Sequence, residues 1–546
     1  MIKYKKRSAG ILLHISSLPN KYGIGTLGKS AYEWIDLLAD CGISYWQVLP
    51  LVQTSYGDSP YQSAYSGSGN PYFIDFDILV KEGLLKKSEL SVCRNTKSKI
   101  DYAFLYQNKY GVLRKAYERF DIQNADFVSF VENGRFDGYA LFMAIKEKFG
   151  GVSFDRWPDE YKFAKKRSLR KFKAENQKEY LFWLFLQYEF SKQWNTLKRY
   201  ANEKGVSIIG DIPLYVAYDS ADVWLNPKLF KLNTDRSLKK VAGVPPDYFS
   251  ATGQLWGNPV YHWAVHKKDN YKWWLERFRQ AFELYDVVRV DHFRGLDRYY
   301  EIDAGETTAV KGKWKHGPKY ELFRTAESLL GKLNIIAEDL GSLDKGVYRL
   351  MDETGYPGMK VMEFAFDGNK KNPYLPKNIK ENSVCYTGTH DNDTLLCYIS
   401  KLKDGEYNIF KESLERTLKE GDVQCYLENK IEMAKAGRDI HIVGTTGEIQ
   451  GFLEENRFVV RTYNADTLLY NERTVDLAKD VSGADRHSGG DSRLIEDFIN
   501  LLNDSPRSIS STVIEDSVYG HLTVFAADES LDKDGEPIDV EISRKN

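Results

Sequence analysis

The segment DVVRVDHF, residues 286–293, decides the fold because it is a short apolar run that ends in polar side chains. Continuous apolarity over the length of a strand is typical of parallel strands that are buried on both faces. Six further runs share this form and are separated by segments of helical spacing: GILLHIS (10–16), YWQVLPL (45–51), VSIIGDIPLYV (206–216), LNIIAEDL (333–340), MKVMEFAF (359–366) and SVCYTGTHDND (383–393). The alternation predicts an α/β fold in which parallel strands form a barrel.

Polar side chains gather at the C-terminal ends of five of these runs. They are Asp211, Asp291 with His292, Glu338 with Asp339, Glu363, and His390 with Asp391. In a barrel of parallel strands, the active site occupies the face formed by the C-terminal strand ends. One charged strand end is ordinarily the start of a solvated loop, but a series of them predicts a catalytic rim.

Two of these strand ends offer a pair of carboxyl groups with different surroundings. Arg289 and Asp291 are two residues apart on one strand, so their side chains share a face. We expect the guanidinium to hold the pKa of Asp291 low, as a nucleophile requires. Glu338 supplies a second carboxyl group, and such a pair is what retaining glycoside chemistry needs. A metal site is the rival use of carboxylates, but the chain has only 9 histidines and no H-E-x-x-H motif, so we expect no catalytic metal.

The bulk composition excludes several classes of protein. At 546 residues the chain has room for one large domain with insertions or for two to three domains. A formal net charge of −2 gives no basic excess for a nucleic-acid partner. The 5 cysteines contain no C-x-x-C pair, which indicates a reducing compartment. No apolar run reaches transmembrane length, and the apolar N-terminal stretch is predicted as a strand, so we expect a cytoplasmic protein without a membrane partner.

The stretch GIGTLG, residues 23–28, matches the G-x-G-x-x-G dinucleotide fingerprint. Its context is poor, because SLPNKY separates it from the preceding strand and the next predicted strand ends without a carboxylate. The stretch therefore predicts a plain glycine loop that opens a helix in KSAYEWIDLLADCG, and we expect no cofactor. Residues 81–204, rich in Lys, Glu, Leu and Tyr at helical spacing, are predicted to be a helical insertion on the barrel.

Several longer motifs make the chain resemble a known family. They are VVRVDHFRG, IIAEDLG and YTGTHDND, with YGDSPYQS and GNPYFID near the start and GVPPDYFSATGQLWGNP in the middle. Together they resemble the 4-α-glucanotransferases (amylomaltase or disproportionating enzyme, glycoside hydrolase family 77) over about residues 8–400. The resemblance implies a (β/α)8 TIM-type barrel that cleaves an α-1,4-glucan donor and passes the glycosyl segment to a sugar acceptor.

The resemblance also implies roles for individual residues. Asp291 would be the nucleophile, Glu338 the general acid and then base, and Asp391 a stabiliser of the oxocarbenium-like transition state. The remaining matches are substrate-binding positions: Arg289, His292 and His390 around the sugar at the cleavage point, Tyr56, Asp211 and Asp367 at other sugar contacts, and Gln254 and Trp256 on the acceptor-side loop.

The resemblance ends at about residue 400, where the family's eighth strand and closing motifs are missing. After a junction at 401–435, residues 436–546 resemble the C-terminal α+β domain of the glucose–fructose oxidoreductase and inositol dehydrogenase-like family. We favour a gene fusion as the origin of this tail, and the alternatives are a joining error in the sequence and a divergent glucanotransferase ending. We expect an open gap beside residues 10–15, unless residues 439–443 supply the eighth strand. In the tail, we interpret residues 530–541 as a turn rather than a calcium loop, and the stretch around His487 as a capped helix start.

Three functions remain open at this point. The first is a 4-α-glucanotransferase that works by a retaining double displacement through a covalent glycosyl-enzyme. The second is a catalytically impaired maltodextrin-binding fusion protein, because the barrel lacks its last strand. The third is a nicotinamide-dependent sugar oxidoreductase, which depends on the tail alone.

Overall fold

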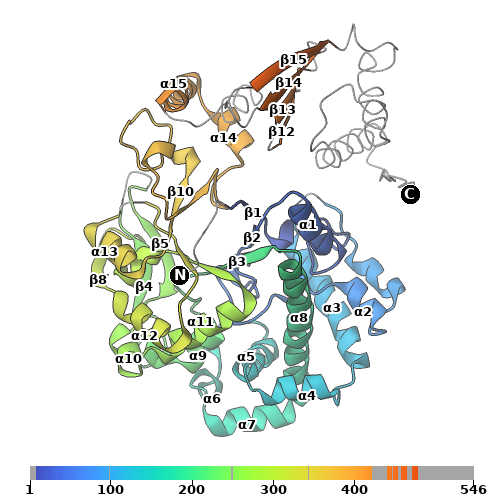
Figure 1. Ribbon diagram of the computed structural model, residues 1–546. Coiled ribbons are helices and arrows are strands. Elements are labelled where there is room, and N and C mark those ends of the chain that lie inside the picture. The colour runs from blue at the N-terminus through green and yellow to red at the C-terminus, as the bar shows by residue number, and fades with distance from the viewer. Residues whose placement is uncertain are drawn as a thin grey trace. The chain divides into compact units, whose positions relative to one another are not determined.

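The computed structural model describes residues 8–97, 99–246, 250–341, 343–420, 439–444, 447–452, 457–463 and 470–476 (Figure 1). The chain divides into two compact units. The first is Met1–Lys360 with Lys380–Cys385, and the second is Val361–Ile379 with Tyr386–Asn546. In the described part of the chain, no helix has the length and apolarity that crossing a membrane would require.

A seven-stranded sheet forms the centre of the first unit, and each predicted apolar run contributes one strand. In spatial order the strands are β1 (Gly10–Leu12), β2 (Tyr45–Gln47), β3 (Ser207–Ile212), β6 (Val287–Val290), β9 (Ile335–Ala337), β10 (Gly358–Val361) and β11 (Ser383–Tyr386). The pairs from β1 through to β10 are parallel. All four residues of β6 are buried, as continuous apolarity predicts. The predicted α/β barrel-type architecture is therefore confirmed.

The register of the three central strands brings the predicted active-site residues together. Asp211 of β3 lies opposite Arg289 of β6, and Val290 lies opposite Ala337 of β9. The residues that follow are tied to the neighbouring strand, because the amide of Asp291 donates to Ile212 O at 3.1 Å and the amide of Glu338 donates to Val290 O at 3.1 Å. Asp291 and Glu338 therefore leave adjacent strands at the same end of the sheet.

The outer edge of the sheet at β1 is open among the described residues. β1 and β11 end the strand order, and Gly10 and Ile11 of β1 are exposed. Residues 439–443 belong instead to β12 (Asp439–Gly444), which pairs antiparallel with β13 (Gly447–Phe452). An unpaired edge exposes backbone N–H and C=O groups. Among the described strands none pairs with the outer edge of β1, as the sequence predicts, and the gap itself stays a prediction.

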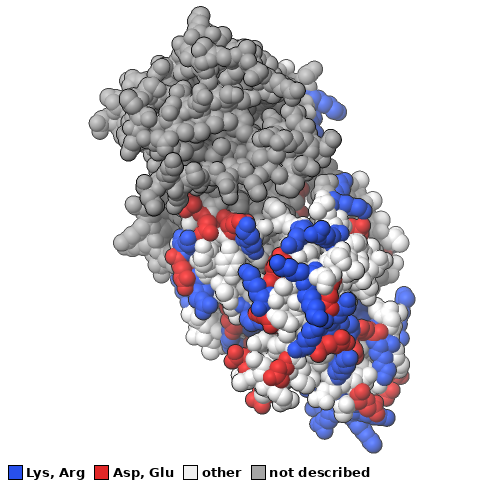
Figure 2. Space-filling model, turned by 90° about the vertical axis from the view of Figure 1, so that its right-hand side faces the viewer, with Lys and Arg blue, Asp and Glu red and all other residues white. Residues whose placement is uncertain are grey.

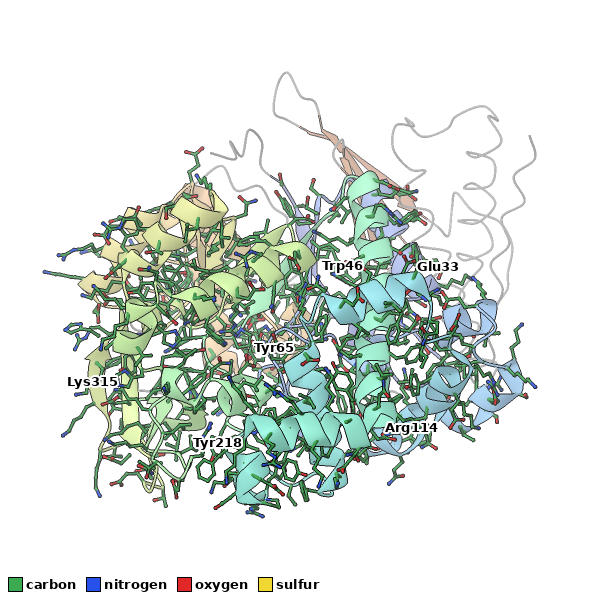
Figure 3. All side chains as sticks on the ribbon, turned by 90° about the horizontal axis from the view of Figure 1, so that it is seen from below. Glu33, Trp46, Tyr65, Arg114, Tyr218 and Lys315 are labelled. Carbon is green, nitrogen blue, oxygen red and sulfur yellow. The ribbon has the colours of Figure 1, made fainter. Side chains whose placement is uncertain are left out.

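Most of the predicted insertion is helical. It contains α3 (Tyr102–Arg119), α4 (Ala125–Glu132), α5 (Asp137–Lys148), α6 (Asp159–Lys162), α7 (Lys166–Glu175) and α8 (Gln177–Glu203), and α2 (Phe76–Lys81) precedes them. Helix α8 packs against α3 and α5 (Figure 1). Arg114 of α3, labelled in Figure 3, donates hydrogen bonds to Glu147 of α5 and Glu179 of α8 and so links the three helices. Figure 2 shows Lys and Arg interspersed with Asp and Glu on the described face, in keeping with the net charge of −2.

A second sheet of four strands was not predicted from the sequence. Its strands, in spatial order, are β5 (Gln254–Pro259), β4 (Lys240–Val244), β7 (Arg298–Asp303) and β8 (Lys313–His316), and their pairing is antiparallel. The remaining helices of the first unit are α1 (Lys29–Asp40), α9 (Ala221–Leu225), α10 (Trp263–Lys268), α11 (Lys272–Leu284), α12 (Tyr320–Leu330) and α13 (Lys345–Thr354). Because β5 begins at Gln254, this sheet carries the predicted acceptor-side loop.

The glycines of GIGTLG serve close packing. A side chain at Gly25 would meet the carbonyl oxygen of Ile15 at 1.8 Å, and one at Gly28 would meet the Asp75 carboxylate at 2.0 Å. Helix α1 begins directly after Gly28, so the predicted glycine loop opening a helix is confirmed. Contacts with Ile15 and Asp75 thus account for these two glycines without a phosphate group.

The second unit contains α14 (Leu395–Lys401), α15 (Asp404–Glu420) and a four-stranded antiparallel sheet of β12, β13, β14 (Arg457–Tyr463) and β15 (Tyr470–Asp476). The predicted α+β tail and its resemblance to an oxidoreductase domain stay predictions, because residues 477–546 lie outside the described residues. The interpretations of His487 and of residues 530–541 lie there as well.

Candidate active site

Arg289 is the centre of a buried ion-pair network at the end of β6. Its Nη1 lies 2.6 Å from Asp211 Oδ2, and its Nη2 lies 2.9 Å from Asp291 Oδ1. Its Nε lies 3.4 Å from the sulfur of Met359. The side chains of Arg289 and Asp211 are 3% and 0% exposed, whereas that of Asp291 is 29% exposed. Asp291 is thus the carboxylate of this network that solvent, and a substrate, can reach.

Glu338 has a different environment, although it lies at the next strand end. Its carboxylate accepts hydrogen bonds from the amide of His292 at 2.9 Å and from the amide of Leu340 at 2.8 Å. Burial is the main cause that raises the pKa of Glu338 to about 7, and the negative charge of Asp291 raises it further. Arg289 acts in the opposite direction, as do the two backbone hydrogen bonds.

The two carboxyl groups are therefore suited to different tasks. Asp291 is paired with a guanidinium, which favours the ionised form of a carboxyl group. Glu338 holds its proton up to about pH 7, so it can act as an acid near neutral pH. Pairs of carboxyl groups whose environments separate their protonation in this way divide the roles of nucleophile and general acid.

An aromatic cluster lies beside the carboxyl pair and joins it to strand β5, which carries the predicted acceptor-side residues. The rings of His292 and Trp256 meet edge to face, with centroids 4.8 Å apart. Tyr215 lies 6.2 Å from Trp256 and 6.4 Å from His292, and the indole N–H of Trp256 donates to Gln254 Oε1 at 3.0 Å. Burial lowers the pKa of His292 to about 3, so its imidazole is neutral at ordinary pH.

Tyr61 belongs to this site and was missed by the sequence analysis. Its hydroxyl donates to Asp211 Oδ2 at 2.7 Å, on the same oxygen that binds Arg289. The motif YGDSPYQS contains this residue, but the resemblance assigned a sugar contact to Tyr56. Tyr56 lies in a short 3-10 helix, Tyr56–Asp58, and its side chain is outside the described part.

Three predicted site residues, Asp367, His390 and Asp391, belong to the second unit. The Asp391 side chain is exposed and lies 3.5 Å from His390 Nε2, and Asp367 accepts a hydrogen bond from the amide of Asn369. Their roles stay predictions from the motifs. The structure brings together Asp211, Arg289, Asp291, His292, Glu338, Gln254 and Trp256 within the first unit. Among the described residues, no group of three His, Cys, Asp or Glu side chains could hold a metal ion.

Comparisons with known proteins agree on one family. A family model described as 4-alpha-glucanotransferase matches residues 13–443. A 4-alpha-glucanotransferase of Clostridium butyricum is 50% identical over 389 residues, covering 70% of this chain and 80% of that protein. One from Thermus thermophilus is 43% identical over 399 residues, or 71% of this chain and 79% of that protein. An amylomaltase from Streptococcus agalactiae, solved in complex with acarbose, matches with a TM-score of 0.73 and 39% identity over 79% of this chain and 88% of that one.

Proposed function

The chain belongs to the 4-alpha-glucanotransferase family, and from this premise we propose that it transfers α-1,4-glucan segments between maltodextrins through a covalent glycosyl-enzyme. The observation that carries the proposal is the contrast between two carboxyl groups at adjacent strand ends. Asp291 is paired with Arg289, while Glu338 has a pKa of about 7. A retaining double displacement needs one ionised nucleophile and one protonated acid.

In the first proposed step, an Asp291 oxygen attacks the anomeric carbon of the donor. Glu338 gives its proton to the glycosidic oxygen, which leaves with the reducing-end piece of the glucan. In the second step, Glu338 removes the proton from the 4-hydroxyl of an acceptor sugar, and that oxygen displaces Asp291 from the anomeric carbon. Two inversions preserve the α-configuration, and each enzyme group returns to its starting state.

The neighbouring residues support the proposed binding roles. His292 is neutral at working pH, so its ring can exchange hydrogen bonds with sugar hydroxyls without adding charge. Trp256 and Gln254 lie on β5 beside His292. The flat indole of Trp256 suits the face of an acceptor sugar, and the amide of Gln254 suits its hydroxyl groups. Because the Asp211 side chain is completely buried, we propose that it acts through Arg289.

The other predicted residues enter the proposal through their motifs alone. Asp391 is proposed as the third carboxylate of the site, and Tyr56, Asp367 and His390 as sugar contacts. The partners would be an α-1,4-glucan donor and a sugar acceptor, with no nucleic acid and no membrane. We also propose a cytoplasmic location, which rests on the composition of the chain alone.

Incubation with maltotriose tests the function directly. A glucanotransferase converts maltotriose to glucose and longer maltodextrins, whereas glucose and maltose alone would indicate hydrolysis. Asp291→Asn is the control, since it removes the nucleophile and should leave neither product series. Chromatography of the products at several times distinguishes these outcomes.

One observation favours a second candidate, a maltodextrin-binding protein that has lost turnover. In the described part of the chain, β1 has no partner on its outer edge. Calorimetry that detects maltodextrin binding while product analysis detects no turnover would support that candidate. Incubation with NAD or NADP and a panel of sugars tests the oxidoreductase alternative, which a constant absorbance at 340 nm would remove.

A further inference from the structure

Arg277 of α11 is a buried cation that the proposed chemistry does not use. It is 5% exposed. Among the described residues it forms no direct ion pair, but its charge acts on the nearby buried carboxyl of Asp222, where it opposes the rise in pKa that burial causes. Its guanidinium lies over the rings of Trp273 and Trp274, 5.4 and 5.0 Å from their centroids. A buried charge without a direct ion-pair partner is costly, so its hydrogen bonds and ring contacts must help to compensate the lost hydration.

Those contacts are two successive backbone carbonyls at the end of β3. Nη1 donates to Leu214 O at 3.1 Å, and Nη2 donates to Pro213 O. The hydroxyl of Tyr261 also donates to Leu214 O, at 2.7 Å. A planar guanidinium presents its donors in a fixed fork, so it can orient two neighbouring carbonyls at once in a way that an ammonium cannot.

The segment held in this way leads directly to the aromatic cluster. Tyr215 follows Leu214, and its ring stacks on that of Tyr261 with centroids 5.9 Å apart. The rings of Trp256 and His292 also lie next to the Tyr215 ring. The rings of Trp256 and His292 thus neighbour the Tyr215 ring, and the backbone just before Tyr215 is hydrogen-bonded to Arg277.

A small cavity borders this segment, although the side chains of Leu214 and Tyr215 are buried. Pro213, Tyr215, Val216 and Arg277 line the cavity, together with Tyr61, Asp211 and Gln280 on other sides. Without Arg277, the carbonyls of Pro213 and Leu214 would lose the guanidinium donors that orient them beside this cavity. The Tyr261 hydroxyl would still donate to Leu214 O if Arg277 were replaced, but Pro213 O would lose its side-chain donor.

We propose that Arg277 is a positioning residue for the acceptor side of the site, acting through the Pro213–Leu214 carbonyls and the Tyr215 ring. The inference rests on the proposed function and deepens it, since it assigns to Arg277 an influence on whether an acceptor sugar or water attacks the glycosyl-enzyme. Displacement of a binding group by about 1 Å can cost about 10²-fold in rate.

The test compares Arg277→Met with Arg277→Lys in the full chain. Each variant is incubated with maltotriose and ¹³C-labelled glucose, and label entering maltodextrins is measured against maltotriose hydrolysed. Arg277→Met should lower the ratio of transfer to hydrolysis by about tenfold or more and raise the KM for glucose. Arg277→Lys keeps the charge but replaces the planar fork with a single ammonium, so it should recover part of the transfer ratio and of the glucose KM. Tyr261→Phe should change both quantities less.

Arg236→Met is the matched control, because Arg236 also donates to a backbone carbonyl, Trp224 O at 3.1 Å, and also lies over a ring. It should lower thermal stability without changing the transfer ratio. An unchanged ratio and glucose KM in Arg277→Met, or an equal change in Arg236→Met, would overturn the proposal. If Arg277→Met does not fold, a wild-type ratio in Arg277→Lys overturns it. Absence of transfer by the wild-type chain overturns the proposed function, and this inference with it.

Discussion

The pH dependence of the first chemical step offers the sharpest prediction about Glu338. Burial and the Asp291 charge raise its pKa from 4.5 to about 7. At pH 7 about half of the molecules then carry the proton, whereas with the ordinary value about 1 in 300 would. Because the acid must be protonated, kcat/KM for maltotriose should fall above pH 7, by about tenfold at pH 8 relative to its plateau.

The assay compares two donors over pH 5 to 9. With maltotriose the leaving oxygen needs a proton, so kcat/KM should fall above pH 7, and this fall is the basic limb of the pH profile. With α-maltosyl fluoride the leaving group needs none, so the limb should disappear, and Glu338→Gln should retain the fluoride reaction while losing the maltotriose reaction. Glu189→Gln is the matched control, because the pKa of Glu189 is also raised to about 7, yet it lies on α8 in the insertion. A limb that persists with the fluoride, or moves in Glu189→Gln, would refute the assignment.

Three further outcomes can be measured. Asp211→Asn breaks a completely buried pair with Arg289 and should lower the free energy of unfolding by about 3–5 kcal/mol in urea titrations. Asp303→Asn removes an ion pair whose carboxylate is exposed, so it should lower the free energy of unfolding far less. Burial raises the pKa of Glu189 from 4.5 to about 7, so Glu189 is protonated more readily in the folded chain. Its contribution to the free energy of unfolding, about 3 kcal/mol, is fully present below pH 4.5 and is lost as the pH rises through about 7. Glu189→Gln should abolish this loss, which thermal melts at pH 5 and pH 8 will check. Trp256→Ala should raise the KM for an acceptor sugar and leave the basic limb in place, which initial rates at varied glucose will check.

The central sheet and its catalytic end could be predicted because they follow from local patterns. Each apolar run gave one strand, and the two-residue spacing of Arg289 and Asp291 correctly predicted that their side chains meet. The raised pKa of Glu338 was required by the proposed chemistry, but the cause lies in burial and in the neighbouring strand, which no local pattern contains.

What the sequence analysis missed depends on contacts between distant segments. The four-stranded side sheet joins residues 240–259 with residues 298–316 and contains short, mixed runs such as KWKH, which carry no alternation. Tyr61 meets Asp211 across 150 positions of sequence. Arg277 sits in a helical pattern that predicts only a buried face, and its carbonyl partners are visible only after β3 is placed.

The charges around Arg289 also explain how one carboxyl pair can serve both steps. The guanidinium is shared between Asp211 and Asp291, and the charge of Asp291 ranks directly after burial among the causes that raise the pKa of Glu338. In the proposed mechanism, Asp291 loses that charge when it forms an ester with the sugar, so the pKa of Glu338 falls, which is the change a general base requires. A deprotonated Glu338 activates water as readily as a sugar hydroxyl. The choice of acceptor must therefore come from the surface that places the sugar, and this is the role we assign to the ring of Tyr215 and the residues that rest on it.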